Sequence, residues 1–302
     1  MGWEAHRMRI LNLGSMNFDK VYDVEHFVGA GETILCRGYG EFFGGKGLNQ
    51  SVALAKAGAQ VYHAGAIGPD GKPFLEYLSA AGVNTQYVCQ VDTVSGHAII
   101  QNAGGQNCII VYGGANQCVE RGYIQKILEN FGPGDILLLQ NETSNVPFAM
   151  EEAKRRGMKI AFNASPITGA LLEYPLELVD WLLVNEVEGK ALSDVDAKAN
   201  EAILEDLCKK FPSAAIVLTV GEQGVLYRDR EISASHGIYK VEVADTTAAG
   251  DTFSGYFLSC IAKGLSVQTA LEMASRASAI AVSKHGASAS IPAWEDVAAF
   301  RG

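Results

Sequence analysis

The sequence predicts an α/β protein, a three-layer α/β/α sandwich with a mostly parallel sheet and a small additional β-sheet. Short apolar runs alternate with amphipathic stretches roughly every 20–30 residues, which is the spacing of βαβ units. Strands joined in this way lie parallel and carry helices on both faces, which gives three layers. Two glycine-containing segments, about 17–43 and 93–113, lack helical periodicity and are rich in β-forming residues, which indicates the second sheet.

The expected strands of the main sheet are continuous apolar runs, as strands buried on both faces are. In chain order they cover residues 9–13, 60–64, 136–140, 159–163, 181–185 and 215–220. Apolar residues at helical spacing predict helices over 47–57, 72–81, 119–130, 147–156 and 197–210. Two longer helices, 251–263 and 267–284, are expected after a β-like run that ends at Val243.

The small sheet includes a predicted hairpin. Residues 96–102 and 107–112 are strand-like, and the Gly104–Gly105 pair between them is typical of a tight turn. Because these segments interrupt the strand–helix alternation, we expect the sheet to stand off the main body as a lid or an interface. The chain contains no internal repeat and no low-complexity linker. We therefore expect one domain over residues 1–302, with the β lid as a subdomain.

Composition narrows the class of function. The 24 Lys and Arg residues against 34 Asp and Glu leave a net charge of −10, which argues against non-specific nucleic-acid binding, because such binding depends on neutralising phosphates. No apolar run approaches the roughly 18 residues of a membrane-spanning helix, and no secretory signal pattern is present. The six cysteines lack CxxC spacing and indicate reduced, mostly buried thiols. We expect a cytoplasmic enzyme that binds neither nucleic acid nor a membrane.

The most informative motif is Asp245-Thr-Thr-Ala-Ala-Gly-Asp251-Thr-Phe, a turn of small residues before a long helix. The unpaired N–H groups of a first helical turn attract an anion, and Ala248, Ala249 and Gly250 leave room for a phosphate. Asp251 then lies where a carboxylate can accept a proton from a substrate hydroxyl beside the transferred phosphoryl group. The alternative is that Asp251 only caps the helix.

Glycine is in excess, with 33 of 302 residues, or about 11% where roughly 7% is usual. One cluster is Phe43-Gly-Gly-Lys46-Gly-Leu-Asn49-Gln. Its spacing from Gly40 resembles a Walker A loop, but Gly47 stands where that loop needs Ser or Thr, so we reject a P-loop. The remaining interpretation is a glycine loop that opens a helix and offers Lys46 and Asn49 to a polyhydroxylated ligand. A glycine-rich turn without a ligand is the alternative.

Weaker signals follow three of the buried strands. Asn17 and Asp19 alternate along an extended segment where open α/β sheets bind ligands, although Asn and Asp there usually only turn the chain. Asn185 and Glu188 are three residues apart at a helix start, which suits a hydrated Mg²⁺ or a capping box. Glu142 is a lone carboxylate with the same ambiguity. The histidines show no metal-ligand spacing, so we interpret them as structural or surface residues.

Together these motifs resemble the ribokinase family of carbohydrate kinases, also called the PfkB family. Gly44-Gly-Lys-Gly-x-Asn-Gln50 is similar to the family's N-terminal signature, and the motif from Asp245 to its C-terminal signature. Asn185-x-x-Glu188 and Thr219-Val-Gly221 lie between them in the family's order. The resemblance extends over residues 10–294, and within the family it is strongest to the members that phosphorylate ribose.

The resemblance implies a role for each matching position. The sugar hydroxyls would be bound by Asn17, Asp19, Gly45, Lys46, Asn49 and Glu142, with Asp251 as the general base on the terminal hydroxyl. The N–H groups of Ala248, Ala249, Gly250 and Asp251 would form the anion hole. Asn185 and Glu188 would position Mg²⁺ and the ATP phosphates, Glu188 through water. Thr219, Gly221, Gly250 and the stretch around His285 would face the nucleotide.

The resemblance also implies a site for an activating monovalent cation, K⁺, beside the anion hole. The matching positions are Asp245, Thr247, Ala281, Lys284, Gly286 and Ser290, mainly through carbonyl groups. The cation would stiffen the anion-hole loop without touching the substrate. The family further implies a homodimer in which two β lids clasp.

The reaction that the resemblance implies is ATP + D-ribose → ADP + D-ribose 5-phosphate. Phe18, Phe42 and Phe43 make the expected sugar surroundings unusually aromatic, which leaves 2-deoxyribose, fructose, another sugar or a nucleoside open as the substrate. A catalytically silent sugar sensor and a nucleotide-dependent oxidoreductase are alternatives of other classes. Asp251 and the Gly250 turn argue against the sensor, and the lack of G-x-G-x-x-G after the first strand argues against the oxidoreductase.

Overall fold

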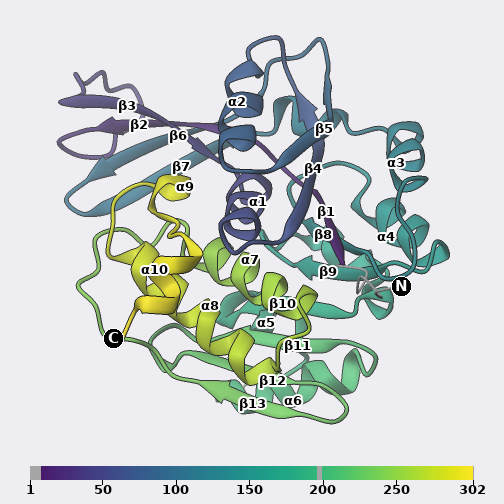
Figure 1. Ribbon diagram of the computed structural model, residues 1–302. Coiled ribbons are helices and arrows are strands. Elements are labelled where there is room, and N and C mark those ends of the chain that lie inside the picture. The colour runs from purple at the N-terminus through teal and green to yellow at the C-terminus, as the bar shows by residue number, and fades with distance from the viewer. Residues whose placement is uncertain (1–7, 196–198, 302) are drawn as a thin grey trace.

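The computed structural model describes residues 8–195 and 199–301. Its main body is a nine-stranded sheet in the order β13-β12-β11-β10-β9-β8-β1-β4-β5 (Figure 1). The parallel strands are β1 (Arg9–Leu13), β4 (Gln60–Ile67), β5 (Asn84–Gln90), β8 (Ile136–Gln140), β9 (Lys159–Asn163), β10 (Trp181–Asn185) and β11 (Ala215–Thr219). At one edge, β12 (Val225–Arg228) and β13 (Ser233–His236) are antiparallel. The ends of the expected domain, 1 and 302, and the expected helix start at 197 lie outside the described residues.

Helices cover both faces of this sheet and form two apolar cores. The first core includes residues of α1 (Lys46–Lys56), α2 (Lys72–Ala80), α7 (Ala249–Ala262), α8 (Val267–Val282) and α10 (Trp294–Ala299). The second includes residues of α3 (Arg121–Leu128), α4 (Val146–Arg155), α5 (Glu186–Leu192) and α6 (Asn200–Lys210). Ile10 lies in the first core and its neighbour Leu11 in the second, because successive side chains of a strand point to opposite faces. The predicted three-layer arrangement is confirmed.

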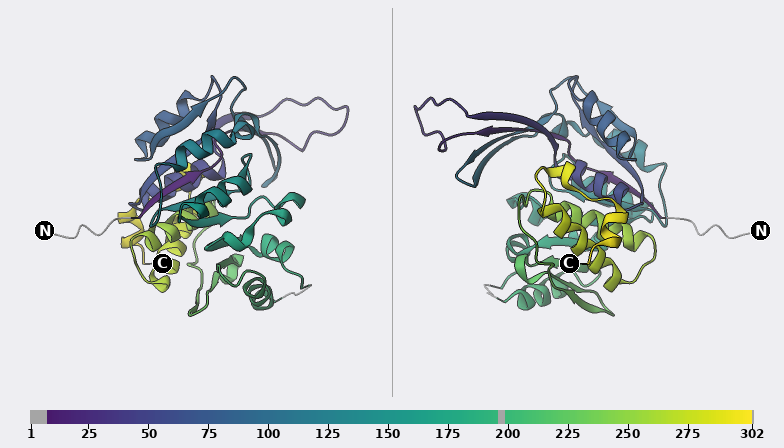
Figure 2. Two further views of the ribbon diagram at one scale, coloured as in Figure 1. Left: turned by 90° about the vertical axis from the view of Figure 1, so that its right-hand side faces the viewer. Right: turned by 60° about the vertical axis from the view of Figure 1, so that its left-hand side comes forward.

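A second, four-stranded sheet projects from the main body (Figure 2). Its order is β3-β2-β6-β7, built from β2 (Asn17–Asp23), β3 (Gly38–Gly44), β6 (Gly96–Ala103) and β7 (Gln106–Tyr112). The turn between β6 and β7 is Gly104–Gly105, with φ angles of 55° and 79° that glycine adopts without strain. This sheet confirms the predicted second sheet.

Aromatic side chains join the two sheets. Phe18 of β2 and Phe43 of β3 pack against Phe74 of α2, with ring centroids 4.1 Å and 5.6 Å away. Phe43 also lies 4.6 Å from the ring of Tyr77, and α9 (Ala287–Ser290) contacts β3 as well. Of the three phenylalanines noted in the sequence, Phe18 and Phe43 therefore pack at this junction, whereas Phe42 is exposed.

Several local predictions are wrong. The strand β5 has no predicted counterpart, because it lies at the sheet edge with half-exposed polar residues and carries no apolar run. The β-like run before Val243 is not a strand, since β13 ends at His236 and residues 237–248 form neither strand nor helix. α7 begins at Ala249, two residues earlier than expected. Of the six cysteines only Cys260 is buried, so the thiols are not mostly buried.

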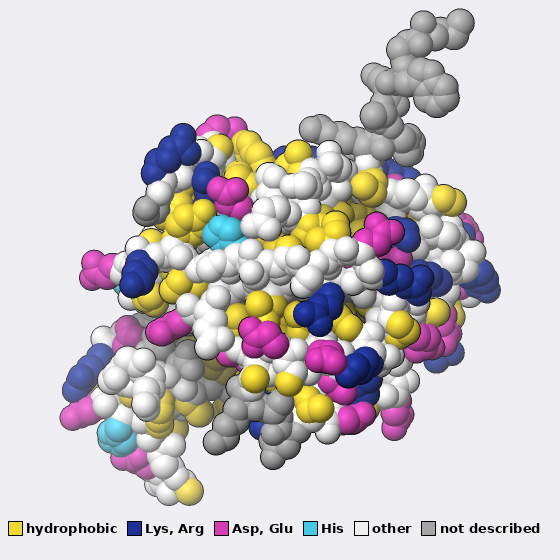
Figure 3. Space-filling view, turned by 90° about the horizontal axis from the view of Figure 1, so that it is seen from below, with side chains coloured by type: hydrophobic (Ala, Val, Ile, Leu, Met, Phe, Trp, Pro, Cys, Tyr) yellow, Lys and Arg dark blue, Asp and Glu magenta, His cyan; other side chains and the backbone are white. Residues whose placement is uncertain are grey.

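The surface carries charges of both signs. Figure 3 shows one face, on which Lys and Arg side chains are interspersed with Asp and Glu and do not gather in one area. Within the described part of the chain, no helix combines the length and the apolar character that crossing a membrane requires.

Candidate active site

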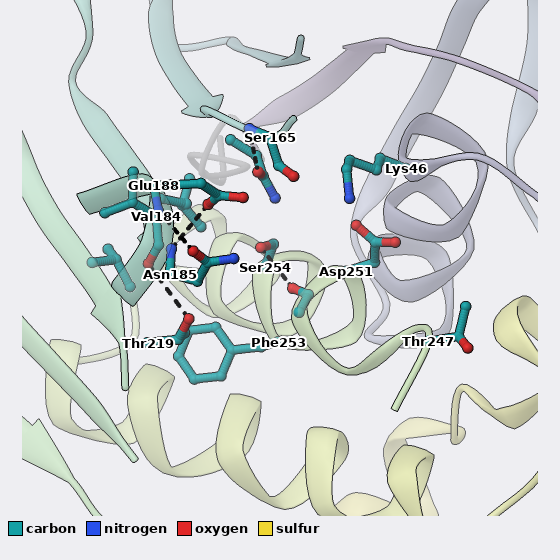
Figure 4. Close-up of a pocket in the computed structure, with 14 residues that line it drawn as sticks. Lys46, Ser165, Val184, Asn185, Glu188, Thr219, Thr247, Asp251, Phe253 and Ser254 are labelled. Carbon is teal, nitrogen blue, oxygen red and sulfur yellow. Dashed lines mark hydrogen bonds between the residues drawn. The ribbon is translucent and has the colours of Figure 1, made fainter. Parts of the chain in front are cut away.

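A pocket lies beyond the carboxyl ends of β9, β10 and β11, between these strand ends and the start of α7 (Figure 4). Ligands of open α/β sheets bind at this end of the strands, because the loops that follow them meet there. The residues that line the pocket are Lys46, Asn163, Ser165, Leu183, Val184, Asn185, Glu188, Val217, Thr219, Thr247, Gly250, Asp251, Phe253 and Ser254.

The glycine loop before α1 fixes Glu142 beside Lys46. Gly45 has a φ of 90°, which is open to glycine and strained for other residues, and α1 begins directly after it. The Glu142 carboxylate accepts a hydrogen bond from the Lys46 backbone N–H at 3.0 Å and another from the Ser15 hydroxyl. Ser15 in turn accepts one from the Gly47 N–H at 3.3 Å. These bonds connect the loops after β1 and β8 to the first turn of α1.

Asp251 is buried at the third position of α7 and is held by α1. Its Oδ2 accepts a hydrogen bond from Asn49 Nδ2 at 2.9 Å, and its Oδ1 accepts one from Gln50 Nε2 at 2.8 Å. The N-cap residue of α7 is Ala248, and the helix has no side-chain cap. The interpretation of Asp251 as only a helix cap is therefore wrong. Burial raises the pKa of Asp251, against the opposing effects of Lys46 and the two amide donors.

Lys46 lies among several carboxylates. Burial disfavours its charged form, but Asp251, Glu142 and Glu188 outweigh this and raise the pKa of Lys46, so the ammonium stays charged at neutral pH. Figure 4 shows this side chain facing Asp251. Burial, together with the charges of Glu142 and Asp251, raises the pKa of Asp19 to about 7. The structure thus brings these predicted residues into one electrostatic neighbourhood.

The first residues of β2 complete this side of the site. Asn17 is buried, and its Oδ1 accepts a hydrogen bond from Asn116 Nδ2 at 2.8 Å. Asn116 also pairs with the backbone of Met16, so it fixes the chain where β2 begins. The carboxylate of Asp19 lies over Gly44 of β3, where a Cβ atom would overlap it. Gly44, the last residue of β3, therefore leaves space for the Asp19 side chain.

Asn185 and Glu188 face Lys46 across the pocket (Figure 4). They also form a capping box, in which the Glu188 N–H donates to Asn185 Oδ1 and the Asn185 N–H donates to Glu188 Oε2, both at 2.9 Å. The capping-box interpretation is therefore confirmed, and the Mg²⁺ interpretation stays a prediction. Thr219 lines the pocket as well, whereas Gly221 lies in a short 3₁₀ turn and is not among the lining residues. His285 is exposed and does not line it either.

The turn before α7 leaves backbone donors free. The Ala249 N–H donates to the Thr246 carbonyl at 3.2 Å, and the Thr252 N–H donates to Ala248 at 2.8 Å. Among residues 8–195 and 199–301, no group accepts a hydrogen bond from the N–H of Gly250 or Asp251. Gly250 lines the pocket and has open space where a side chain would be. The turn can therefore accept an anion.

The positions predicted to hold a monovalent cation lie before the start of α7, at the end of α8 and around α9. The Asp245 carboxylate accepts hydrogen bonds from the Thr247 N–H at 2.9 Å, the Thr247 hydroxyl at 2.5 Å and the Gly286 N–H at 3.2 Å. Burial opposes ionisation of Asp245, but these bonds lower its pKa below the ordinary value. The carbonyls of Ala281 and Gly286 accept from the N–H groups of Lys284 and Ser290. No cluster of three or more His, Cys, Asp or Glu suited to a metal occurs in the described residues.

Several residues of the site have no predicted role. Ser15 holds Glu142, and Gln50, the last residue of the glycine motif, holds Asp251. Asn163 and Ser165 line the pocket after β9. Their signal is the one that identified Asn185, a polar residue directly after a buried strand, and it could have found them.

Comparisons with known proteins agree with this geometry. Residues 8–294 match the pfkB family carbohydrate kinase. A ribokinase of Staphylococcus aureus (strain COL) is 35% identical over 300 residues, which cover 96% of this chain and 98% of that protein. The structure of Arabidopsis thaliana ribokinase complexed with ribose and ATP has a TM-score of 0.86 at 29% identity, covering 96% of this chain and 97% of that one. Thermotoga maritima ribokinase has a TM-score of 0.84 at 34% identity, covering 97% and 98%. The chain therefore belongs to the pfkB family of carbohydrate kinases.

Proposed function

We propose that this chain is a ribokinase, which transfers the γ-phosphoryl group of ATP to the 5-hydroxyl of D-ribose. The observation that carries the proposal is a buried carboxylate, Asp251, beside the free N–H groups at the start of α7. A proton acceptor next to an anion site is what phosphoryl transfer to a hydroxyl group requires. Full-length similarity to ribokinases from several organisms supports ribose as the sugar.

In this proposal the sugar lies between β2 and α1. Its hydroxyls are bound by Asn17, Asp19, Gly45, Lys46, Asn49 and Glu142, a set that combines carboxylate acceptors with ammonium and amide donors. Asp251 accepts the proton of the 5-hydroxyl as that oxygen bonds to phosphorus. Of the predicted anion-hole positions Ala248, Ala249, Gly250 and Asp251, the Ala249 N–H is already bonded to the Thr246 carbonyl. The free N–H groups of Gly250 and Asp251 stabilise the charge that develops on the transferred group, because they are oriented before the reaction begins.

The ATP phosphates would occupy the pocket beside Asn185, Thr219 and Gly250, with the nucleotide extending toward Gly221. Glu188 suits a hydrated Mg²⁺, because its Oε2 is used in the capping box and its Oε1 is left to hold a water. When bound, Mg²⁺ neutralises charge on the ATP phosphates. Lys46 approaches the same region from α1 with a charged ammonium.

We further propose K⁺ activation at Asp245, Thr247, Ala281, Lys284, Gly286 and Ser290. The donor set fits a weakly hydrated monovalent ion, because it offers one carboxylate and several carbonyls, whose second lone pairs are available. The ion would hold the turn that carries the free N–H groups. Replacing K⁺ by Na⁺ or by a bulky organic cation is expected to lower kcat, and equal rates in all three salts would remove this part of the proposal.

The whole chain would form one cytoplasmic domain with a lid subdomain, built from residues 17–43 and 93–113. Two such lids would pair two chains into a homodimer. Support comes from β7, which is exposed throughout and carries apolar side chains, with Ile110 61% and Val111 62% exposed. We expect light scattering to give the mass of two chains for the wild type and of one chain for Ile110→Asp. The matched control is Leu172→Asp, also at an exposed apolar residue but outside the small sheet. A wild-type monomer would contradict the dimer.

The deciding experiment measures ADP release with ATP, Mg²⁺ and K⁺ over a panel of D-ribose, 2-deoxyribose, fructose and nucleosides. We expect the highest kcat/KM with D-ribose. A higher value for another member would assign the chain to that substrate within the same family. Sugar binding by calorimetry without ADP release from any member would instead favour the sugar sensor.

A further inference from the structure

A row of buried polar side chains leads from Asp251 into the interior of the first core. Its members are Gln50 and Ser51 of α1, Asn12 of β1, His63 of β4 and Gln140 of β8. Gln140 is 1% exposed and the other four are fully buried. The reaction proposed above uses Asp251, at the end of this row, and gives no role to the five side chains behind it.

Two successive hydrogen bonds lead from Gln140 to Asp251, and in each the donor is the residue farther from Asp251. Gln140 Nε2 donates to Gln50 Oε1 at 2.7 Å, and Gln50 Nε2 donates to Asp251 Oδ1 at 2.8 Å. An amide that accepts at its oxygen becomes a stronger donor at its nitrogen, so Gln140 both orients and strengthens the bond that Gln50 makes to Asp251. The second donor to Asp251, Asn49, lies outside this row.

Gln140 is itself anchored on its other side. Its Nε2 also donates to Asn12 Oδ1 at 2.9 Å, and Asn12 Nδ2 donates to Ser51 Oγ and to the Gly47 carbonyl, both at 2.8 Å. Ser51 Oγ lies 2.8 Å from His63 Nδ1. Burial lowers the pKa of His63 to about 4, so the imidazole is neutral at pH 7. Its Nδ1 can then accept a hydrogen bond from the Ser51 hydroxyl.

Packing alone does not account for this row. Buried amides cost free energy unless each is hydrogen-bonded, and apolar side chains of similar shape would fill the same space at no such cost. The neighbouring positions on the same face, Ile10 and Leu138, are apolar in this way. Gly14 leaves room for the Gln140 side chain, because a Cβ atom on Gly14 would overlap Gln140 Oε1. The arrangement fixes the orientation of one amide, that of Gln50.

We propose that Gln140 is a positioning residue for phosphoryl transfer, which holds Gln50 against Asp251 and is itself anchored by Asn12, Ser51 and His63. The inference rests on the proposed function, because it gives Gln140 a role only if Asp251 accepts the substrate proton. Gln140 touches neither sugar nor nucleotide. Its effect is on the geometry of the Asp251 carboxylate and on the stability of its charged form.

The test is Gln140→Met, which keeps the side-chain length and removes both donors. We expect kcat to fall between about 10-fold and 100-fold, as misplaced reacting groups do, with the KM values for ribose and ATP within about threefold of wild type. The acid limb of kcat should move upward by about one pH unit, because the ionised carboxylate loses a firmly held donor. The charged groups facing Asp251, namely Lys46 of α1, Glu142 after β8 and Asp19 of β2, are unchanged in the variant.

The matched control is Leu138→Ala, at a fully buried position two residues earlier on the same strand and face. It should lower the melting temperature at least as much as Gln140→Met and leave the acid limb of kcat in place. Should Gln140→Met fail to fold, Asn12→Leu frees the Gln140 amide from its anchor, and a smaller change of the same kind is expected. The inference is overturned if the wild type is active and the folded Gln140→Met variant has the same kcat and the same pH profile. An inactive wild type overturns the proposed function instead.

Discussion

The helices α1 and α7 begin at the same site and pack against each other, yet their first turns are completed in opposite ways. In α1 the first three N–H groups are all used inside the protein, by Glu142, by the Ser15 hydroxyl and by the Ser15 carbonyl. In α7 only the Ala249 N–H is used, and those of Gly250 and Asp251 have no acceptor in the described residues. The start of α1 is closed by the protein, and the start of α7 is open, with two backbone donors unused.

The glycines of the two starts show the same contrast. A Cβ atom on Gly47 would overlap the backbone of Gly14 and Ser15, so this glycine is required by packing. A Cβ atom on Gly250 would meet nothing within 4 Å, so this glycine is not required by the protein itself. α1 is therefore a fixed frame that supplies Lys46, Asn49 and Gln50, whereas in the proposed function the start of α7 is where the phosphoryl group would bind.

Asp251→Asn should have the largest effect on activity, because in the proposed function Asp251 is the proton acceptor at the open start of α7. We expect kcat to fall by about 10²–10⁴-fold, the usual contribution of a general base, with ribose affinity largely retained. Steady-state kinetics gives kcat, and calorimetry with ribose gives the affinity. The sharpest check on a folding artefact is the calorimetric titration, since an unfolded variant would bind no ribose. Turnover near that of the wild type would contradict the role of Asp251.

Gly47 and Gly250 allow a paired test of the closed start of α1 against the open start of α7. Gly47→Ala should reduce the free energy of unfolding by about 1–3 kcal/mol, because the methyl group has no room against rigid backbone. Gly250→Ala should leave stability unchanged or raise it by up to about 1 kcal/mol, since alanine suits a helix better. Its methyl group enters the pocket, so kcat/KM for ATP should fall about tenfold or more.

Urea denaturation and ATP kinetics on both variants give the answer. The contrast fails if Gly250→Ala destabilises the fold as much as Gly47→Ala does, or if it turns over ATP as the wild type does. Each variant serves as the control for the other, because both place one methyl group at the start of a helix that lines the same site.

The difference between the two helix starts also separates what the sequence could predict from what it could not. Strands β1, β8, β9 and β10 have their predicted bounds, because strands buried on both faces are continuous apolar runs. The glycine loops are local signals, so Lys46 and Asp251 could be singled out.

The supporting contacts are long-range and leave no such signal. Gln140 and Gln50 are 90 residues apart, and Asn12 and Gln140 are 128 apart. A polar residue inside an apolar strand carries no indication of which distant side chain it will meet. Similarly, the closed state of α1 depends on Ser15 and Glu142, which come from two other loops, so it becomes visible only in the folded chain.

The last prediction concerns Asp19, which lies beside the closed start of α1 with a pKa raised to about 7 by burial and by Glu142 and Asp251. Asp19 in the unfolded chain ionises near 3.8, so between that pH and 7 the folded protein keeps a proton that the unfolded chain has lost. This contribution to stability is fully present at low pH and is lost as the pH rises through 7. Relative to Asp19→Asn, which cannot titrate, the wild type should lose about 2 kcal/mol of unfolding free energy between pH 5 and pH 7. Urea denaturation of both proteins at each pH measures the difference. Parallel curves would mean that Asp19 is already ionised at pH 5, and that the closed side of the site tolerates three neighbouring negative charges around Lys46.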